Sequence, residues 1–306
     1  MLSTFADVAW YTDGFDVRID RSATTGSTVV VVAEDGEWVV TDAIEAPRLR
    51  AEEPALVGLE VVVHPWTGTA DDVVRELAGG REPVTDLDLQ PLRMVLDDEA
   101  VDRYRRLGAD MRAVFDAVAS ALTPRTSELD AAGRLAAAAW ELGAHTPVLL
   151  VAGADRIPRF RHPLPTAAPL GARAMLVACL ERGGLYASLT RFVHFTDPPP
   201  DLAARLRVTD ELLARMREQA TVEGTTLGEA FAACRRFYRE AGFADEWTRH
   251  HQGGIAGYAS RERIARPGDP TELRPGMAFA WNPSVTGAKS EETFVLLEGG
   301  GTEVLT

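Results

Sequence analysis

The first hundred residues alternate between short apolar runs and polar turns, which is typical of a small α/β unit. The β-branched run Ser27–Ala33 is followed by a turn at Gly36 and by the apolar segment Glu37–Thr41, and together these predict a β-hairpin. Further along, Leu59–Val63 predicts a third strand and Ala70–Leu77 predicts a short helix. The chain is therefore expected to begin with a small α/β domain.

A change in pattern marks the end of this domain. The stretch Gly79–Leu92 is rich in Gly, Pro and Asp, as linkers between domains often are. From Asp97 onward, apolar residues recur at helical spacing, first over Asp97–Leu122 and then over Ser127–Leu142. We therefore predict a small domain over residues 1–95 and a larger domain over residues 96–306.

The larger domain twice repeats a pair of helices followed by antiparallel strands. The second pair of helices is predicted over Leu202–Glu223 and Leu227–Ala241. The predicted strands are Val148–Ala152, Ala174–Leu180, Leu185–Phe195, Met277–Asn282, Thr293–Leu297 and Glu303–Leu305. This order favours an α+β fold over a doubly wound parallel sheet, and the repeated block hints at an internal duplication.

Composition and charge narrow the class of protein. The chain has 306 residues, 46% hydrophobic and 25% charged, so it can form a sizeable core. Its formal net charge of -14 argues against nucleic acid or an anionic membrane as the partner, because both are also negative. No apolar run approaches the ~20 residues that a membrane span needs. We expect the partner to be a small-molecule substrate.

The N-terminus and the cysteines indicate a location. The first residues lack the basic start and apolar core of a signal peptide. Two cysteines, Cys179 and Cys234, are too few for a disulfide scaffold. The abundance of Ala, Arg, Gly and Asp is compatible with a bacterial gene of high GC content. The sequence therefore predicts a protein of a reducing, bacterial cytoplasm.

Histidines at two places are candidates for acid–base chemistry, because imidazole titrates near neutrality. His162 lies between Arg161 and Pro163, and taken alone it is most simply a surface loop histidine. His250 and His251 are adjacent and precede a glycine-rich turn, where a ligand can approach the backbone closely. Neighbouring side chains on a strand point to opposite faces. We therefore expect one of this pair to face a pocket while the other packs, and we do not expect the pair to chelate a metal directly.

Polar residues on the predicted strands complete a candidate pocket. Ser188 and Thr190 share one face of their strand, and Arg191 lies on the other. A later strand ends at Asn282, and the next one opens with Glu291. Each of these features also fits a half-exposed polar strand or a simple turn. The candidate substrate-binding residues are Arg161, Ser188, Thr190, Arg191, Tyr258, Arg261, Trp281 and Asn282.

In chain order, these clusters resemble the creatinase, aminopeptidase P and methionine aminopeptidase family over nearly the whole chain. Ile44–Glu53 looks like the small N-terminal domain of creatinase and aminopeptidase P, and Arg161–Thr166 resembles the substrate-side histidine segment. The run Arg274–Phe279 (RPGMAF), with a proline shortly after it, is the most specific match. The resemblance implies a pita-bread fold for the larger domain, preceded by a small creatinase-type α/β domain.

The resemblance also implies where the family's metal ligands would lie. Family members bind two metal ions through two Asp, one His and two Glu. The corresponding positions in this chain are Val177, Ser188, Gly254, Asn282 and Glu291. Only Glu291 keeps a ligand of the family's type, and a dication needs several charged or imidazole ligands together. We therefore expect no metal and no other cofactor.

Creatinase is the family member that works without metal, and the chain resembles it at His162 and Glu291. In creatinase these positions hold the proton shuttle and a carboxylate that binds the guanidinium. Thr190 stands where creatinase has a glutamate, so a guanidinium substrate is doubtful. Several arginines and Lys289 near the expected pocket make an anionic substrate at least as plausible.

The resulting hypothesis is a metal-independent hydrolase of a C–N bond in a small polar molecule, or a related lyase, with His162 as the proton shuttle. The candidate catalytic residues are His162, His250, His251 and Glu291. One alternative is a Xaa-Pro-type metallopeptidase with rearranged ligands, drawn from His162, His194, His250, His251, Glu262 and Glu291. Another is a non-catalytic binding protein on the same scaffold. The resemblance also implies a homodimer.

Overall fold

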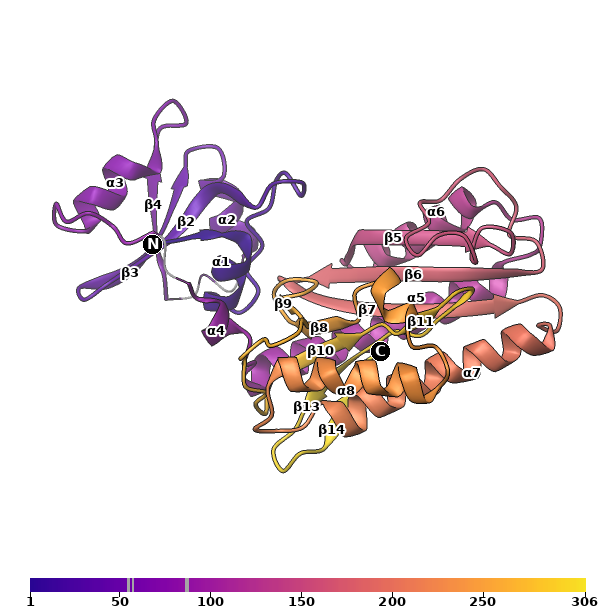
Figure 1. The fold of residues 1–306 in the computed structure, drawn as a ribbon. Helices are drawn as coiled ribbons and strands as arrows, with labels where there is room; N and C mark the ends of the chain where they lie inside the picture. The colour runs from indigo at the N-terminus through magenta and orange to yellow at the C-terminus, as the bar shows by residue number, and fades with distance from the viewer. Residues whose placement is uncertain (54–55, 57, 86–87) are drawn as a thin grey trace. The chain divides into compact units, whose positions relative to one another are not determined.

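The computed structural model describes residues 1–53, 56, 58–85 and 88–306 (Figure 1). It divides into two compact units, Met1–Arg93 and Met94–Thr306, so the division falls two residues before the predicted boundary. Asp86 and Leu87, in the predicted linker, lie outside the described residues. Within the described part of the chain, every helix is too short or too polar to cross a lipid bilayer.

The first unit is a four-stranded sheet with short helices. Its strands run in the order β1-β2-β3-β4, and β3 pairs with β4 in parallel. The strands are β1 (Leu2–Thr4), β2 (Thr25–Ala33), β3 (Gly36–Asp42) and β4 (Glu60–His64). The helices are α1 (Phe5–Tyr11), α2 (Ala46–Glu52), α3 (Ala70–Leu77) and α4 (Gln90–Arg93). The sequence pattern predicted the hairpin of β2 and β3, but it missed β1 and α1, which are too short to show a periodicity.

The second unit begins with two helices that pack on a three-stranded sheet. The helices α5 (Asp98–Ala121) and α6 (Glu128–Glu141) start at Asp97 and Ser127, whose side chains accept a hydrogen bond from a backbone N–H in the first turn. Strands β5 (His145–Gly153), β6 (Arg173–Arg182) and β7 (Leu185–His194) follow as an antiparallel sheet in that order. Polar caps and apolar periodicity therefore predicted this half well.

The same plan recurs in the second half of this unit. Helix α7 (Pro200–Arg215) continues into a π-helical turn (Met216–Ala220) and packs beside α8 (Leu227–Glu240), as Figure 1 shows. A five-stranded sheet follows in the order β14-β13-β10-β8-β9. These strands are β8 (Gly253–Ala256), β9 (Arg263–Ile264), β10 (Ala278–Trp281), β13 (Glu292–Leu296) and β14 (Thr302–Val304), and a separate ribbon pairs β11 (Ser284–Val285) with β12 (Ala288–Lys289).

Strand β8 lies inside the sheet although its sequence did not predict a strand. Gly253 and Gly254 supply two of its four residues, and glycine has no side chain to give the alternating pattern. Close backbone packing requires them. A Cβ on Gly253 would lie 2.0 Å from Ala280 O, and one on Gly254 would lie 2.1 Å from Arg263 O. The two neighbouring strands therefore approach β8 too closely for any side chain at either position.

The two sheets of the second unit meet along β7 and β13. The backbone N–H of Ser188 donates to Thr293 Oγ1 at 2.8 Å, and that hydroxyl donates to Ser188 O at 3.0 Å. A β-bridge also joins Thr190 to Glu291. Residues about one hundred positions apart in the sequence therefore lie side by side at this seam.

Candidate active site

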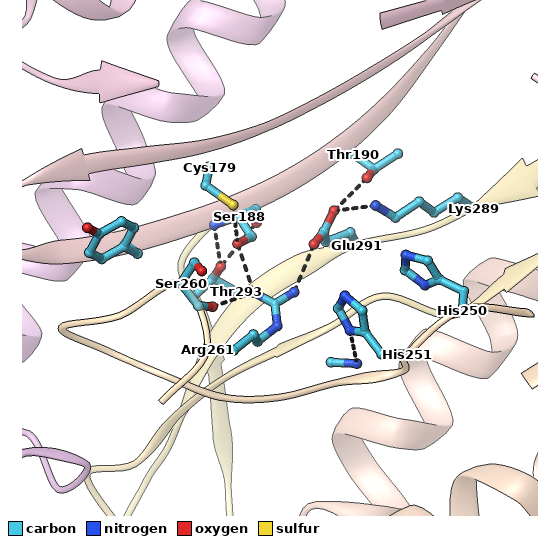
Figure 2. Close-up of polar contacts among 12 residues, drawn as sticks. Cys179, Ser188, Thr190, His250, His251, Ser260, Arg261, Lys289, Glu291 and Thr293 are labelled. Atoms are coloured by element: carbon cyan, nitrogen blue, oxygen red, sulfur yellow. Dashed lines mark hydrogen bonds and ion pairs between the residues drawn. The ribbon is translucent and has the colours of Figure 1, made fainter. Parts of the chain in front are cut away.

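A buried carboxylate, Glu291, is held by two cations at the seam between the sheets (Figure 2). Lys289 Nζ donates to Glu291 Oε2 at 2.9 Å, and Arg261 Nη2 donates to Oε1 at 3.0 Å. Thr190 Oγ1, on β7, also donates to Oε2 at 2.8 Å. The side chains of Glu291, Lys289 and Arg261 are 4%, 6% and 9% exposed. Both carboxylate oxygens are therefore satisfied by groups of this chain, and the three ions form a buried cluster with an excess of positive charge.

The guanidinium of Arg261 spans the seam. Its Nη1 donates to Ser188 Oγ at 3.1 Å and to the carbonyl of Ser260 at 2.6 Å, while Nη2 contacts Glu291 (Figure 2). The Ser188 hydroxyl is also 3.2 Å from Cys179 Sγ on β6. A planar guanidinium suits this position, since its fork of donors reaches partners on both sheets at once.

The charge state of Glu291 follows from its neighbours. Burial alone would raise its pKa, but the cations Lys289 and Arg261 outweigh burial and lower the pKa of Glu291 to about 2. The carboxylate is therefore ionised at neutral and mildly acidic pH.

Three histidines converge beside this ion cluster. His162 Nε2 and His250 Nε2 are 2.9 Å apart, and the rings of His250 and His251 stack with centroids 4.6 Å apart. One ring nitrogen from each histidine lies within 4.8 Å of the other two. His251 lies on the wall of a cavity and His250 is buried behind it, but the two rings stack instead of pointing to opposite faces. Both residues precede β8 and lie in a loop, so the alternation of a strand does not apply to them.

A buried amide fixes the loop that carries the histidine pair. Gln252 is fully buried, and its Nε2 donates to the carbonyl of His250 at 2.5 Å. Its Oε1 accepts a hydrogen bond from the Tyr238 hydroxyl of α8 at 2.7 Å. The loop is therefore tied to the helix behind it, which limits how far the two imidazoles can move.

A second buried carboxylate fixes the loop that carries His162. Glu128, at the start of α6, is 0% exposed and accepts from the backbone N–H groups of Gly153 and Thr166, both at about 2.8–2.9 Å. It also pairs with Arg156, whose guanidinium donates to the carbonyl of Leu164 at 3.1 Å. These contacts bracket His162 on both sides in the sequence.

Burial and neighbouring cations keep the histidines neutral. Burial followed by Lys289 lowers the pKa of His250 to about 2, and burial followed by Arg261 lowers the pKa of His251 to about 4. Burial and then Lys289 also lower the pKa of His162. Near neutral pH, each imidazole is therefore uncharged and offers a nitrogen lone pair.

A cavity of about 310 Å³ opens next to the histidines and the ion cluster. Its walls are Val148, Leu150, His162, Val177, Cys179, His251, Ser260, Arg261, Asn282, Lys289 and Glu291. The residues from β5 and β6 form an apolar wall, and the opposite wall carries the charges and the imidazoles. This volume lies at the lower end of the range for small-molecule sites, ~300–1,000 Å³.

Several candidates predicted from the sequence line this cavity or support it. His162, His251, Glu291, Arg261 and Asn282 lie on its wall. His250 stands directly behind His162 and His251, with only 7% of its surface exposed. Ser188 and Thr190 are not in the wall, but they hold the ion cluster in place from β7.

Four other candidates do not reach the cavity. Arg191 is exposed, on the face of β7 opposite to Thr190, as strand alternation requires. Arg161 pairs instead with Glu246. Tyr258 and Trp281 belong to the interior. The Tyr258 hydroxyl accepts from Arg103 Nη2 at 2.8 Å, and the Trp281 indole donates to Thr221 Oγ1 at 2.8 Å. The structure therefore places these four candidates outside the wall of this cavity.

Some residues of the site were not assigned from the sequence. Lys289 was noted only as a nearby cation, and Cys179, Ser260 and Gln252 were not singled out for this site. One signal for Lys289 is present in the sequence. Lys289 and Glu291 are separated by one residue, and side chains two apart in extended chain point to the same side.

A sequence model of metallopeptidase family M24 matches residues 102–300, most of the larger unit. The chain belongs to metallopeptidase family M24. Solved structures support this at the level of the fold. A dipeptidase from Pyrococcus horikoshii superposes with a TM-score of 0.80 at 15% identity, covering 100% of this chain and 92% of that one. An Xaa-Pro dipeptidase from Bacillus anthracis superposes with a TM-score of 0.75 at 20% identity, covering 93% and 88%.

These comparisons confirm the α+β pita-bread fold that the resemblance predicted. Among curated M24 relatives, the probable dipeptidase PepE of Mycobacterium tuberculosis is 27% identical over 226 residues, which is 71% of this chain and 60% of PepE. The chain therefore spans less than two thirds of the length of that relative.

The positions that the resemblance assigns to the M24 metal ligands do not fit a pair of metal ions here. Val177 and Gly254 offer no donor side chain, and Ser188 and Asn282 are uncharged. The one carboxylate, Glu291, already binds Lys289 and Arg261. A side chain cannot be restored at Gly254 without moving β9, because its Cβ would meet Arg263 O.

The close packing at Gly254 can be tested by mutation. Replacing Gly254 with alanine is expected to lower the free energy of unfolding by ~2–3 kcal/mol, because the methyl group forces β8 and β9 apart. Gly133 offers a matched control. It is exposed on α6 with no atom within 4 Å of its potential Cβ, so Gly133→Ala is expected to stabilise by ~0.5–1 kcal/mol. Urea unfolding measures both, and equal effects would contradict the proposed packing.

Proposed function

We propose that this chain hydrolyses the amide bond of a small, peptide-like molecule that carries a carboxylate. The observation that supports this most directly is the cavity beside neutral His162, with buried cations on the same wall of an M24 fold. The dipeptidase names of its relatives favour a peptide over other amides.

In this proposal, His162 is the group that moves the proton. Like His251, it is exposed and lies in the wall of the cavity, and its neutral imidazole can take a proton from an attacking water. His250, at 2.9 Å from His162 Nε2, holds the ring in place and fixes which nitrogen carries the proton. The protonated His162 can then return the proton to the departing amine, so the step conserves protons.

The cations on the same wall act on negative charge. Lys289 and Arg261 carry two positive charges against the single charge of Glu291, so the wall attracts an anion. This excess charge stabilises both a substrate carboxylate and the oxyanion that forms when water adds to the amide carbon. Glu291 itself orients the two cations and does not act as a nucleophile.

Asn282 supplies a hydrogen-bond acceptor. Its Oδ1 is buried and has no hydrogen-bond partner among the described residues, and Asn282 is one of the residues that line the cavity. A buried acceptor without a partner is costly, so an N–H group of a bound molecule would be favoured there. An amino or amide N–H of a small peptide provides such a donor.

A guanidino substrate, as the likeness to creatinase implies, is less well supported. In that reading Glu291 would bind the substrate guanidinium, but the guanidinium of Arg261 already contacts Glu291 Oε1 at 3.0 Å. Adding a second guanidinium would bring like charges together in a buried site.

The proposal is tested by assaying the purified full-length chain for release of free amine. The panel should contain dipeptides with free carboxylates, among them Xaa-Pro peptides, the same dipeptides as C-terminal amides, and creatine. We expect turnover of at least one free dipeptide, with a clear loss for its amide, because the amide lacks the charge that Lys289 and Arg261 attract. Turnover of creatine alone, or of no compound, would contradict the proposal.

A further inference from the structure

We propose that His162, His250 and His251 bind a single transition-metal ion of the Zn²⁺ type. This site is distinct from the positions that the resemblance assigns to metal ligands. It rests on the geometry of the three imidazoles and not on the proposed hydrolysis. Because a metal ion would occupy the nitrogen lone pair that accepts a proton, His162 would move a proton only in the metal-free protein.

The spacing of the nitrogen atoms is close to what one ion requires. With Zn–N distances of ~2.0–2.1 Å and tetrahedral angles, ligand nitrogens lie ~3.3 Å apart. Here His162 Nε2 and His250 Nε2 are 2.9 Å apart, and a nitrogen from each of the three histidines lies within 4.8 Å of the others. Movements of a few tenths of an ångström up to about an ångström and a half would bring all three to one ion.

The unbound arrangement leaves nitrogen atoms poorly satisfied. The Nδ1 of His250 is buried and has no hydrogen-bond partner among the described residues, and because it carries the ring proton when Nε2 binds a metal, its situation is the same with and without the ion. His251 Nδ1 accepts only a long contact of 3.3 Å from the Gly253 N–H. Metal binding through His251 Nε2 would move the proton to Nδ1 and give up that weak contact. Binding also breaks the hydrogen bond between His162 Nε2 and His250 Nε2, and three metal–nitrogen bonds outweigh the loss of these two contacts.

The imidazole ligands determine which metal ion the site favours, and the surrounding charge determines which fourth ligand it favours. Imidazole nitrogens favour Zn²⁺ and related ions over Mg²⁺ or Ca²⁺, which prefer oxygen ligands. Glu291 offsets one of the two charges of Lys289 and Arg261, so the histidines do not face two unshielded cations. The remaining positive charge favours an anionic fourth ligand, such as hydroxide or a carboxylate, on the side of the cavity.

Binding can be measured directly, without any activity assay. Protein without a histidine tag is freed of bound metal with a chelator, equilibrated with Zn²⁺ and analysed for its metal content. A second metal-free sample receives Co²⁺, whose visible absorption reports a tetrahedral site. We expect one ion per chain. His251→Ala should weaken binding by at least ~100-fold, because even groups behind the ligands are worth ~10–100-fold in affinity.

The controls separate this site from adventitious binding. His251 is exposed, so its replacement by alanine is expected to leave the fold intact, as thermal melting of the metal-free protein would show. His194→Ala removes an exposed histidine at the end of β7, outside the cluster, and should leave metal binding unchanged. Absence of a bound ion, two ions per chain, or equal affinities for the wild-type protein and His251→Ala would each overturn the proposal. Zinc bound to a protein with no hydrolytic activity would support the site while removing the proposed function.

Discussion

Replacing His162 with alanine is expected to lower kcat for the dipeptide substrate by ~10²–10⁴-fold, the usual contribution of a general acid or base. His162 is one of two exposed imidazoles on the wall of the cavity, with His251, and its Nε2 lies 2.9 Å from His250 Nε2, which would hold it in place. KM should change much less, because Lys289, Arg261 and Asn282 remain to bind the substrate. Steady-state kinetics on the wild-type protein and the variant measure both quantities.

The effect of His162→Ala has to be separated from a loss of structure or of metal. His194→Ala serves as the matched variant, because His194 is exposed at the end of β7 and lies outside the site. It should retain full activity. The bound metal content of His162→Ala should be measured alongside its kcat. If His162→Ala turns over substrate at the wild-type rate, His162 has no role in proton transfer.

Replacing Glu291 with glutamine is expected to lower the free energy of unfolding by ~3–5 kcal/mol, the cost of leaving buried charges without their partner. Lys289 and Arg261 are 6% and 9% exposed, and both donate to Glu291. Without the carboxylate, two cations face each other in a buried site. Chemical denaturation would give the difference in unfolding free energy.

A control for Glu291→Gln is available nearby in the sequence. Glu298 is exposed after β13, so Glu298→Gln changes the same charge without disturbing a buried cluster. Its effect should lie within ~0.5 kcal/mol of zero. Should Glu291→Gln prove as mild as Glu298→Gln, the cations would have to be neutralised in another way.

The same cluster predicts a dependence of stability on pH. The two cations lower the pKa of Glu291 to about 2 in the folded protein, below its ordinary value of 4.5. A lowered folded pKa means that the ionised carboxylate stabilises the fold fully above pH 4.5. This contribution is lost as the pH falls from 4.5 toward 2, because the unfolded chain then binds the proton first. Over this range, wild-type protein should lose more stability than Glu291→Gln, and denaturation at several pH values would show it.

Much of the fold could be predicted from local sequence. Helical spacing over Asp97–Leu122 and Ser127–Leu142 predicted α5 and α6, and the predicted strands Ala174–Leu180 and Leu185–Phe195 form the antiparallel pair β6 and β7. In each case the signal lies within a few residues of the element, in an apolar period, a capping side chain or a turn. Strand β8 escaped prediction because its two glycines are dictated by the backbones of β10 and β9 and not by their own neighbours in sequence.

The site was only partly predictable. Its histidines and Glu291 stand out by residue type and by resemblance, yet their relations depend on contacts between distant segments. His162 meets His250 across 88 positions, and Thr190 meets Glu291 across 101. The sequence offered Arg161 and Arg191 as equal candidates to Arg261. Only the tertiary structure shows that, of these three arginines, Arg261 is the one that contacts the Glu291 carboxylate.

By itself, the sequence determined which elements form and which residue types are available for chemistry, because helix caps, turns and apolar periods act over a few residues. The tertiary structure decided that Glu291 is already occupied by two cations of the chain and that three imidazoles share one small space. Charges and lone pairs act over a few ångströms. The distances between these groups are set by the pairing of β7 with β13 and by the loop before β8. No local sequence pattern encodes either of these two features.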